Sequence, residues 1–212
     1  YIDMSTGIPN FNYFHNTLTQ WVEKNIEGSI LLIQPSEYSS IVDLYGRKIG
    51  DELIRQLINR IEPFINDKNQ VIYGRFSNSS FILAVTLPEY ELDQFISQLL
   101  QVTAAPIPIA NREIFITLKI GISPFDNTMS IDESVRRADT ALTKARYQKG
   151  AVVSFFEAET DGEIQRELDI LNQLRFGIQN EEFTVHLQPK VNLMTAEIEG
   201  FEALARWYSP VL

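Results

Sequence analysis

The chain has 212 residues, 44% of them hydrophobic and 22% charged, a composition typical of one or two globular domains. It has no cysteine, which excludes disulfides and thiolate metal sites, and no apolar run near the ~20 residues of a membrane span. The net charge of −10 disfavours broad, non-specific binding of nucleic acid.

The first predicted elements are a helix and a buried strand. Asn10 suits the N-cap of a helix whose apolar residues share one face, and Gly28 is expected to end that helix. These apolar residues are Phe11, Phe14, Leu18, Trp21 and Val22. The run 29–34 is almost entirely apolar, which predicts a central strand buried on both faces.

Apolar residues then recur at helical spacing from Ile41 to Ile61, with Gly46 and Gly50 interrupting the pattern. We therefore predict two helices that meet at a tight corner, the second beginning near Asp51. Next come two apolar, β-prone runs, 70–73 and 82–85, joined by a short polar link. They predict a β-hairpin with its tip at 77–80, where Asn78 best tolerates a left-handed turn. By themselves these residues fit an ordinary surface turn.

Pro88 is expected to open a further helix, and residues 114–122 alternate like a strand. Ser130 and Glu133 form a capping-box pattern that starts a helix ended by Gly150. Its later turns carry Lys144 and Arg146, which suit either compensation of the helix dipole or a phosphate-facing edge. With a strand at 152–156, the order predicts an α+β fold, a sheet covered by helices.

A second segment begins near Glu159 with an amphipathic helix and continues with strands at 183–189 and 198–207. A helix and two strands are too little for an independent core. We expect this segment to open a domain that continues beyond Leu212, and the chain to be a piece of a longer protein.

In this order the landmarks resemble the diguanylate cyclase (GGDEF) family, followed by the start of a cyclic-di-GMP phosphodiesterase (EAL) domain. The resemblance is carried by Asp3…Thr6-Gly7-Ile8-Pro9-Asn10, Tyr45-Gly46…Gly50-Asp51, the 75–81 stretch, Ala138-Asp139…Ala145-Arg146, and Glu202-Ala203-Leu204-Ala205-Arg206-Trp207. It implies an α/β sandwich with a mostly antiparallel central sheet at 1–157, a linker and first EAL helix at 158–180, and an EAL fragment with the first barrel strands at 181–212.

The GGDEF family joins two GTP molecules across a dimer, with Mg²⁺ held by an acid after the first strand and acids in the signature. Here Gln34 and Ser36 occupy the strand-end positions. The signature reads Ser77, Asn78, Ser79, Ser80, Phe81, with its glycines and acids replaced. Val42 stands where the family has a guanine-binding Asn, and the inhibitory Arg-x-x-Asp site falls on 68–71, where it is missing. We expect no cyclase activity and no cofactor for this chain.

Some nucleotide-facing positions remain. The resemblance assigns Asp51 to guanine and Lys144 or Arg146 to phosphate, although Asp51 also suits a simple helix cap. In the EAL part it assigns Glu202 to a metal, and Arg175, Gln188, Leu204 and Arg206 to the cyclic-di-GMP groove. Mg²⁺ or Mn²⁺ is expected only in a complete EAL domain, because one carboxylate cannot hold a metal pair.

Besides a weak cyclase that uses distant metal ligands, two functions are compatible with these residues. The first is an inactive cyclase-like domain that regulates an attached phosphodiesterase by dimerising or by sensing GTP, with residues 159–180 as the connecting helix. The second is a cyclic-di-GMP receptor or protein-interaction adaptor in which both domains are inactive. We expect a cytoplasmic location, with any membrane attachment supplied by segments outside these residues.

Overall fold

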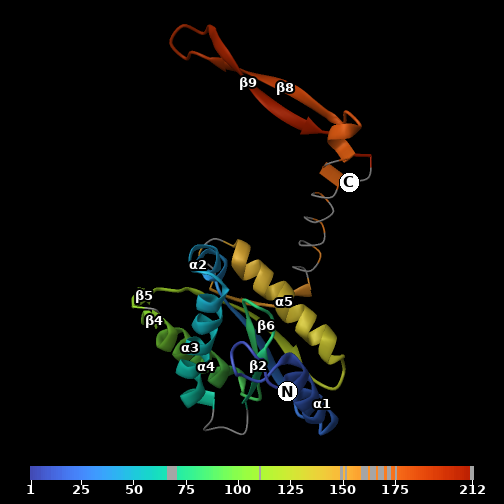
Figure 1. The fold of residues 1–212 in the computed structure, drawn as a ribbon. Coiled ribbons are helices and arrows are strands. Elements are labelled where there is room, and N and C mark those ends of the chain that lie inside the picture. The colour runs from blue at the N-terminus through green and yellow to red at the C-terminus, as the bar shows by residue number, and fades with distance from the viewer. Residues whose placement is uncertain are drawn as a thin grey trace. The chain divides into compact units, whose positions relative to one another are not determined.

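The computed structural model describes residues 1–65, 71–109, 111–148, 150, 152–158, 162, 166, 170, 173–174 and 176–210. Contacts divide the chain into two compact units, Tyr1–Thr160 and Asp161–Leu212. In Figure 1 the first unit is a sheet with helices, and the second ends in a long β-ribbon. None of the described helices is long and apolar enough to cross a membrane.

The first unit contains a five-stranded sheet in the order β2-β3-β1-β6-β7, with antiparallel pairing except for the parallel pair β6–β7. A small two-stranded sheet pairs β4 with β5. The elements of this unit are α1 (Phe11–Glu23), β1 (Gly28–Pro35), α2 (Tyr38–Tyr45), α3 (Arg47–Ile65), β2 (Val71–Arg75), β3 (Phe81–Val85), α4 (Glu89–Thr103), β4 (Ile107–Ile109), β5 (Arg112–Ile114), β6 (Leu118–Phe125), α5 (Ile131–Tyr147) and β7 (Val153–Phe155).

Alternate residues of the central strands enter two separate cores, as the two-residue period of a strand requires. Ile30 and Leu32 of β1 pack with α1 and α5, whereas Leu31 and Ile33 pack with α2, α3 and α4. The strand β1 is thus buried on both faces, which confirms the prediction for 29–34. Figure 1 shows α5 lying over β6, with which it is in contact.

Both predicted helix caps are confirmed. The Asn10 side chain accepts a hydrogen bond from the Tyr13 amide, and the Ser130 side chain accepts one from the Glu133 amide. The C-terminal end predicted for the first helix, Gly28, lies too far along the chain, however. The helix α1 stops at Glu23 because Asn25 adopts a left-handed φ of 57°, and Gly28 begins β1 instead.

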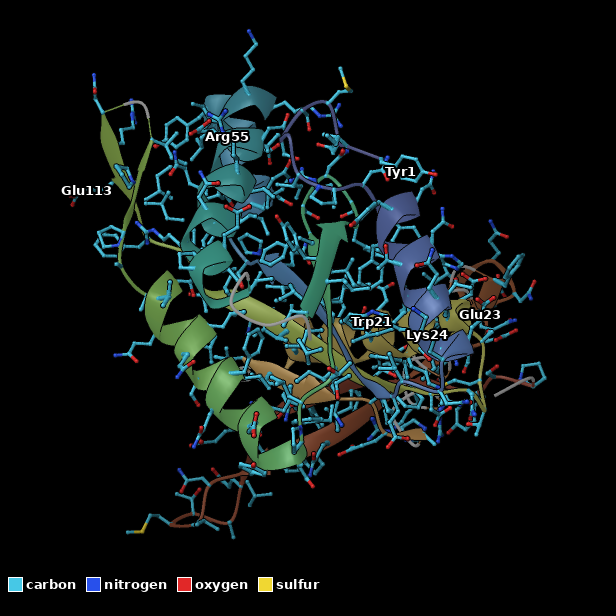
Figure 2. All side chains as sticks on the ribbon, turned by 90° about the horizontal axis from the view of Figure 1, so that it is seen from below. Tyr1, Trp21, Glu23, Lys24, Arg55 and Glu113 are labelled. Atoms are coloured by element: carbon cyan, nitrogen blue, oxygen red, sulfur yellow. The ribbon has the colours of Figure 1, made fainter. Side chains whose placement is uncertain are left out.

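The end of α1 is held on the sheet by an aromatic contact. The Trp21 ring stacks near Phe125 of β6, with ring centroids 6.4 Å apart. Figure 2 labels Trp21 together with Glu23 and Lys24 at this end of the helix. Since Phe125 is fully buried, the contact anchors α1 to the last residue of β6.

The predicted corner between two helices is confirmed at Gly46, where φ is +85°. The second helix begins at Arg47 rather than near Asp51, so the cap reading of Asp51 is wrong. Gly50 does not break α3. A β-carbon at Gly50 would lie 2.6 Å from Val42 Cγ2, so glycine lets α3 approach α2 closely.

The β2–β3 hairpin is confirmed, with Val71 opposite Val85 and Arg75 opposite Phe81. Asn78 is not among the described residues with a left-handed φ, so that part of the prediction is wrong. The strand predicted over 114–122 is in fact two, β5 and β6, separated by residues 115–117. Gly150, predicted to end α5, has a left-handed φ of +86°, but α5 already ends at Tyr147.

The second unit contains β8 (Phe183–Val191) and β9 (Ile198–Trp207), which form an antiparallel ribbon. Both strands confirm the sequence prediction, whereas much of the predicted helix before them lies outside the described residues. Trp207 stacks on Phe183, with centroids 5.3 Å apart, and its indole N–H donates to Glu182 Oε2 at 2.9 Å.

Candidate functional site

The tip of the β2–β3 hairpin is a tight polar turn closed by its own hydrogen bonds. The amides of Phe76 and Ser77 both donate to the Ser80 carbonyl, each at 3.1 Å. The hydroxyls of Ser77 and Ser80 are 2.6 Å apart, and the Ser79 amide donates to Ser77 Oγ at 3.2 Å. The tip is therefore ordered by side-chain hydroxyls, although its sequence contains no glycine.

The end of β1 meets this tip. Gln34 Nε2 donates to Ser79 Oγ at 2.8 Å, which joins residues 45 positions apart in sequence. Ser36 is exposed just beyond the strand, and its amide donates to the Thr117 carbonyl at 2.9 Å. The strand-end and signature positions predicted from the sequence are thus brought together.

Arg75, the last residue of β2, is only 6% exposed and holds the hairpin against the rest of the unit. Its Nη2 donates to Asp51 Oδ1 of α3 at 3.2 Å and also to the Asn78 carbonyl at the tip. Its backbone amide donates to the Pro9 carbonyl at 2.7 Å. Arg75 therefore links the opening segment, α3 and the hairpin tip.

Two buried polar atoms near this link have no hydrogen-bond partner among the described residues: Arg75 Nη1 and the Tyr38 hydroxyl. Burial raises the pKa of Tyr38, although the positive charge of Arg75 opposes the rise. Tyr38 therefore stays protonated at neutral pH. Both side chains are more than nine-tenths buried.

The opening segment is folded around Asp3. Asp3 Oδ1 accepts hydrogen bonds from Ser5 Oγ at 2.7 Å, from the Thr6 amide at 3.0 Å and from Thr6 Oγ1 at 2.6 Å. Burial acts to raise the pKa of Asp3, but these hydrogen bonds, together with Arg75, outweigh it and lower the pKa. Asp3 is therefore anionic at neutral pH, on the same side of the unit as Arg75.

The predicted phosphate contacts lie in the last turn of α5. Lys144 Nζ forms an ion pair with Glu157 Oε2 at 2.8 Å. The Arg146 guanidinium lies 5.9 Å from the centre of the Tyr147 ring. Asp51, the predicted guanine contact, is bound to Arg75, and Val42 on α2 offers no hydrogen-bonding side chain. The remaining nucleotide-facing charges thus already have partners within the protein.

The donor set at the hairpin does not fit Mg²⁺. Magnesium prefers carboxylates together with phosphate oxygens, whereas Gln34, Ser36, Ser79 and Ser80 supply only an amide and hydroxyls. Among the residues that the structure describes, no group of three or more His, Asp or Glu side chains could hold a metal ion. The hairpin can donate and accept hydrogen bonds, but it lacks the negative charge that a divalent cation needs.

In the second unit the ribbon has one polar and one apolar face, because cross-strand partners share a face. Gln188 faces Glu202 across the ribbon. Lys190 Nζ lies 3.6 Å from Glu202 Oε2. The apolar face carries Phe183, Val185, Leu187, Phe201 and Trp207, most of them exposed.

The predicted ligand contacts of this unit are only partly brought together. Leu204 pairs with His186 and Arg206 with Thr184, which places both on the face of Gln188. Arg206 Nη1 donates to the Ala205 carbonyl at 3.0 Å. Arg175 lies outside the described residues.

Sequence reasoning missed the two contacts that organise the hairpin, Arg75–Asp51 and Gln34–Ser79. A signal for the first was present, because Arg75 is a charged residue at the end of an apolar strand. The second had no signal, since an amide and a hydroxyl far apart in sequence pair only through the tertiary fold.

Comparison with known proteins gives one family. Residues 1–151 match the family described as "Diguanylate cyclase, GGDEF domain". The chain is 27% identical over 210 residues to the oxygen sensor protein DosP of Escherichia coli, covering 99% of this chain and 26% of DosP. It is 26% identical over 214 residues to the bifunctional diguanylate cyclase/cyclic di-GMP phosphodiesterase MucR of Pseudomonas aeruginosa, covering 98% of this chain and 31% of MucR.

The chain therefore spans about a quarter to a third of the length of these relatives. Among solved structures, the GGDEF domain of TpbB (YfiN) from Pseudomonas aeruginosa superposes with a TM-score of 0.67 at 18% identity, covering 78% of this chain and 99% of that one. At that identity the likeness shows the fold alone. It agrees with the mostly antiparallel sheet and flanking helices of the first unit.

Proposed function

Because this chain belongs to the diguanylate cyclase GGDEF family over residues 1–151, we propose that its first unit is a non-catalytic GGDEF domain in a cyclic-di-GMP signalling protein. Its role is to regulate an EAL-type phosphodiesterase domain in the same protein. The observation that carries the proposal is the neutral site at the hairpin. The strand-end and signature positions hold Gln34, Ser36, Ser79 and Ser80, none of which carries a charge.

The loss of charge matters because cyclisation of GTP brings together phosphates that a divalent cation must neutralise. Ser77 and Asn78 further oppose turnover, since their side chains occupy the two positions where the family's glycines admit the phosphates to the backbone. Asp51 is engaged by Arg75 at 3.2 Å, which leaves it poorly placed for guanine. Binding of GTP is therefore weak and does not lead to reaction.

The assignment of residues 181–212 to an EAL domain is the second part of the proposal. It is supported by the ribbon, whose polar face carries Gln188, Glu202, Leu204 and Arg206. It is also supported by the relative MucR, which is named a bifunctional diguanylate cyclase/cyclic di-GMP phosphodiesterase. In a complete EAL domain, Glu202 would supply one carboxylate to an Mg²⁺ or Mn²⁺ site, which activates water for phosphodiester hydrolysis. Arg206 would meet a phosphate of cyclic-di-GMP.

The first test is a cyclase assay on purified residues 1–157 with GTP and either Mg²⁺ or Mn²⁺. We expect no cyclic-di-GMP, because the cation site lacks carboxylates. A GGDEF protein with an intact signature serves as the positive control. Any cyclic-di-GMP above the background without protein contradicts the proposal.

The second test is hydrolysis of cyclic-di-GMP by the protein extended through a complete second domain. We expect turnover with Mg²⁺ that is lost in Glu202→Gln, with Glu199→Gln as the matched control on the same strand. No turnover combined with tight binding of cyclic-di-GMP would instead favour the receptor or adaptor function.

A calorimetric titration of residues 1–157 with GTP then identifies the regulatory input. Heat at millimolar GTP supports nucleotide sensing. The absence of heat leaves dimerisation as the route of control, which analytical ultracentrifugation of the same protein tests.

A further inference from the structure

The hydrogen bond between Gln34 and Ser79 stands where the family pattern has two acids that share a metal ion. Gln34 directly follows the buried run 30–33 of β1, and Ser79 is at the hairpin tip. Their side chains are 2.8 Å apart. We infer that this Gln34–Ser79 clasp replaces the divalent cation, so that the hairpin is fixed to β1 without any metal.

The chemistry of the two side chains explains why the clasp needs no metal ion. Two carboxylates at such a short separation repel each other strongly, unless a cation lies between them or one is protonated. An amide N–H and a hydroxyl oxygen attract each other directly. Replacement of the two acids by an amide and a hydroxyl therefore converts a metal-bridged contact into a direct one.

The hydroxyl network around Ser79 supports this role. Ser79 Oγ accepts from Gln34 and lies 3.3 Å from Ser77 Oγ, which is itself 2.6 Å from Ser80 Oγ. A serine hydroxyl can donate one hydrogen bond while it accepts others. The chain of contacts therefore runs from β1 to the start of β3 with each hydroxyl in contact with the next. The clasp is complete without an ion.

The inference rests on the proposed loss of the cation site, and it adds what holds the hairpin in its place. Its decisive test restores the two acids. In Gln34→Asp/Ser79→Asp the direct contact is lost and two carboxylates face each other, so Mg²⁺ and Mn²⁺ should bind between them.

The readouts are thermal unfolding in EDTA or Mg²⁺ at matched ionic strength, and the paramagnetic resonance signal of free Mn²⁺. For the wild type we expect the same melting temperature in both buffers and no loss of the Mn²⁺ signal. For the double variant we expect a melting temperature lower by about 4 °C in EDTA, most of it regained with Mg²⁺, and a reduced Mn²⁺ signal.

Asn16→Asp/Ser97→Asp is the matched control, because it adds the same charge at two separate exposed positions. It should show no specific response to either metal. Stabilisation of the wild type by Mg²⁺, or uptake of Mn²⁺ by the wild type, would overturn the inference. A double variant that folds but is not stabilised by Mg²⁺ and does not take up Mn²⁺ would also overturn the inference.

Ser79→Ala keeps the inference testable should the double variant fail to fold. This change removes the acceptor of the Gln34 amide but adds no charge. We expect a lower melting temperature that is the same in EDTA and Mg²⁺, and an unchanged melting temperature would contradict the clasp. Detection of cyclic-di-GMP synthesis would overturn the proposed function separately, because these readouts involve no nucleotide.

Discussion

Arg75 and Asp51 form an ion pair in which the two side chains are only 6% and 18% exposed. The pair joins the end of β2 to α3, and Arg75 also donates to the Asn78 carbonyl. Arg75, two residues before the signature position Ser77, thus holds the hairpin tip through an ion pair and a hydrogen bond. A nucleotide that bound to Asp51 would have to compete with the Arg75–Asp51 ion pair.

Removal of Asp51 should destabilise the first unit substantially. The variant Asp51→Ala leaves the Arg75 guanidinium buried without its counter-charge, and breaking a buried pair in this way costs about 3 kcal/mol. Denaturant unfolding monitored by circular dichroism measures the change.

The control for this variant lies one turn further along the same helix. Arg55 pairs with Glu52, but its side chain is 52% exposed, and it lies on α3 in Figure 2. Arg55→Ala should therefore change the unfolding free energy by no more than about 0.5 kcal/mol. Equal losses of unfolding free energy in the two variants would show that the buried Arg75–Asp51 pair stabilises the unit no more than the exposed Arg55–Glu52 pair does.

Gly121 should tolerate no side chain, because α5 lies directly on it. A β-carbon there would be 2.2 Å from both the Ala138 carbonyl oxygen and the Leu142 nitrogen, which are backbone atoms that cannot move alone. We expect Gly121→Ala to cost about 3 kcal/mol of unfolding free energy, as other overpacked cores do. Gly200→Ala is the control, since a β-carbon at Gly200 would have no atom within 4 Å. A stable Gly121→Ala protein would contradict the close packing of α5 on β6.

The capping hydroxyl of Ser130 should contribute measurably to α5. Ser130 Oγ accepts from the Glu133 amide at 3.1 Å, which satisfies one of the free donors at the start of the helix. We expect Ser130→Ala to lower the unfolding free energy by about 1 kcal/mol and Ser130→Asp to restore it. Failure of Asp to rescue would point to packing rather than capping.

Periodicity and caps predicted most elements of the fold because both are local properties. Asn10 and Ser130 each accept a hydrogen bond from an amide only three residues further along the chain. The apolar run 29–34 is likewise a local pattern, which can be recognised without knowledge of tertiary contacts. The interruption of the predicted strand 114–122 could not be predicted from such local patterns. The Glu37 side chain accepts from the Thr117 amide at 2.8 Å, a contact between residues 80 positions apart that no local pattern contains.

The candidate site, too, could be predicted only in part from the sequence. The family pattern identified Gln34 and Ser79 as neutral residues at positions where the family has acids, because the type of residue at a position is read directly from the sequence. That these two bond to each other, and that Asp51 bonds to Arg75, depends on how β1, α3 and the hairpin meet. Sequence therefore predicted which charges are missing, and the structure adds what takes their place.

Tyr73 should make the first unit lose stability in alkaline solution. Burial, together with the hydrogen bond that its hydroxyl donates to Glu62 Oε1 at 2.8 Å, raises the pKa of Tyr73 to about 12 from its ordinary value of 10.0. Between these two values the unfolded chain releases the Tyr73 proton while the folded chain keeps it. The unfolding free energy should therefore fall as the pH rises from about 10 to about 12.

The variant Tyr73→Phe removes this proton, so its alkaline decline should be shallower than that of the wild type. At neutral pH it should be less stable by about 1 kcal/mol, because the bond to Glu62 is lost. Denaturant unfolding across the alkaline range measures both effects. Tyr147→Phe is the control, since Tyr147 is 77% exposed, and it should keep the wild-type slope. Parallel slopes for the wild type and Tyr73→Phe would show that the Tyr73 proton is equally held in the folded and unfolded chains.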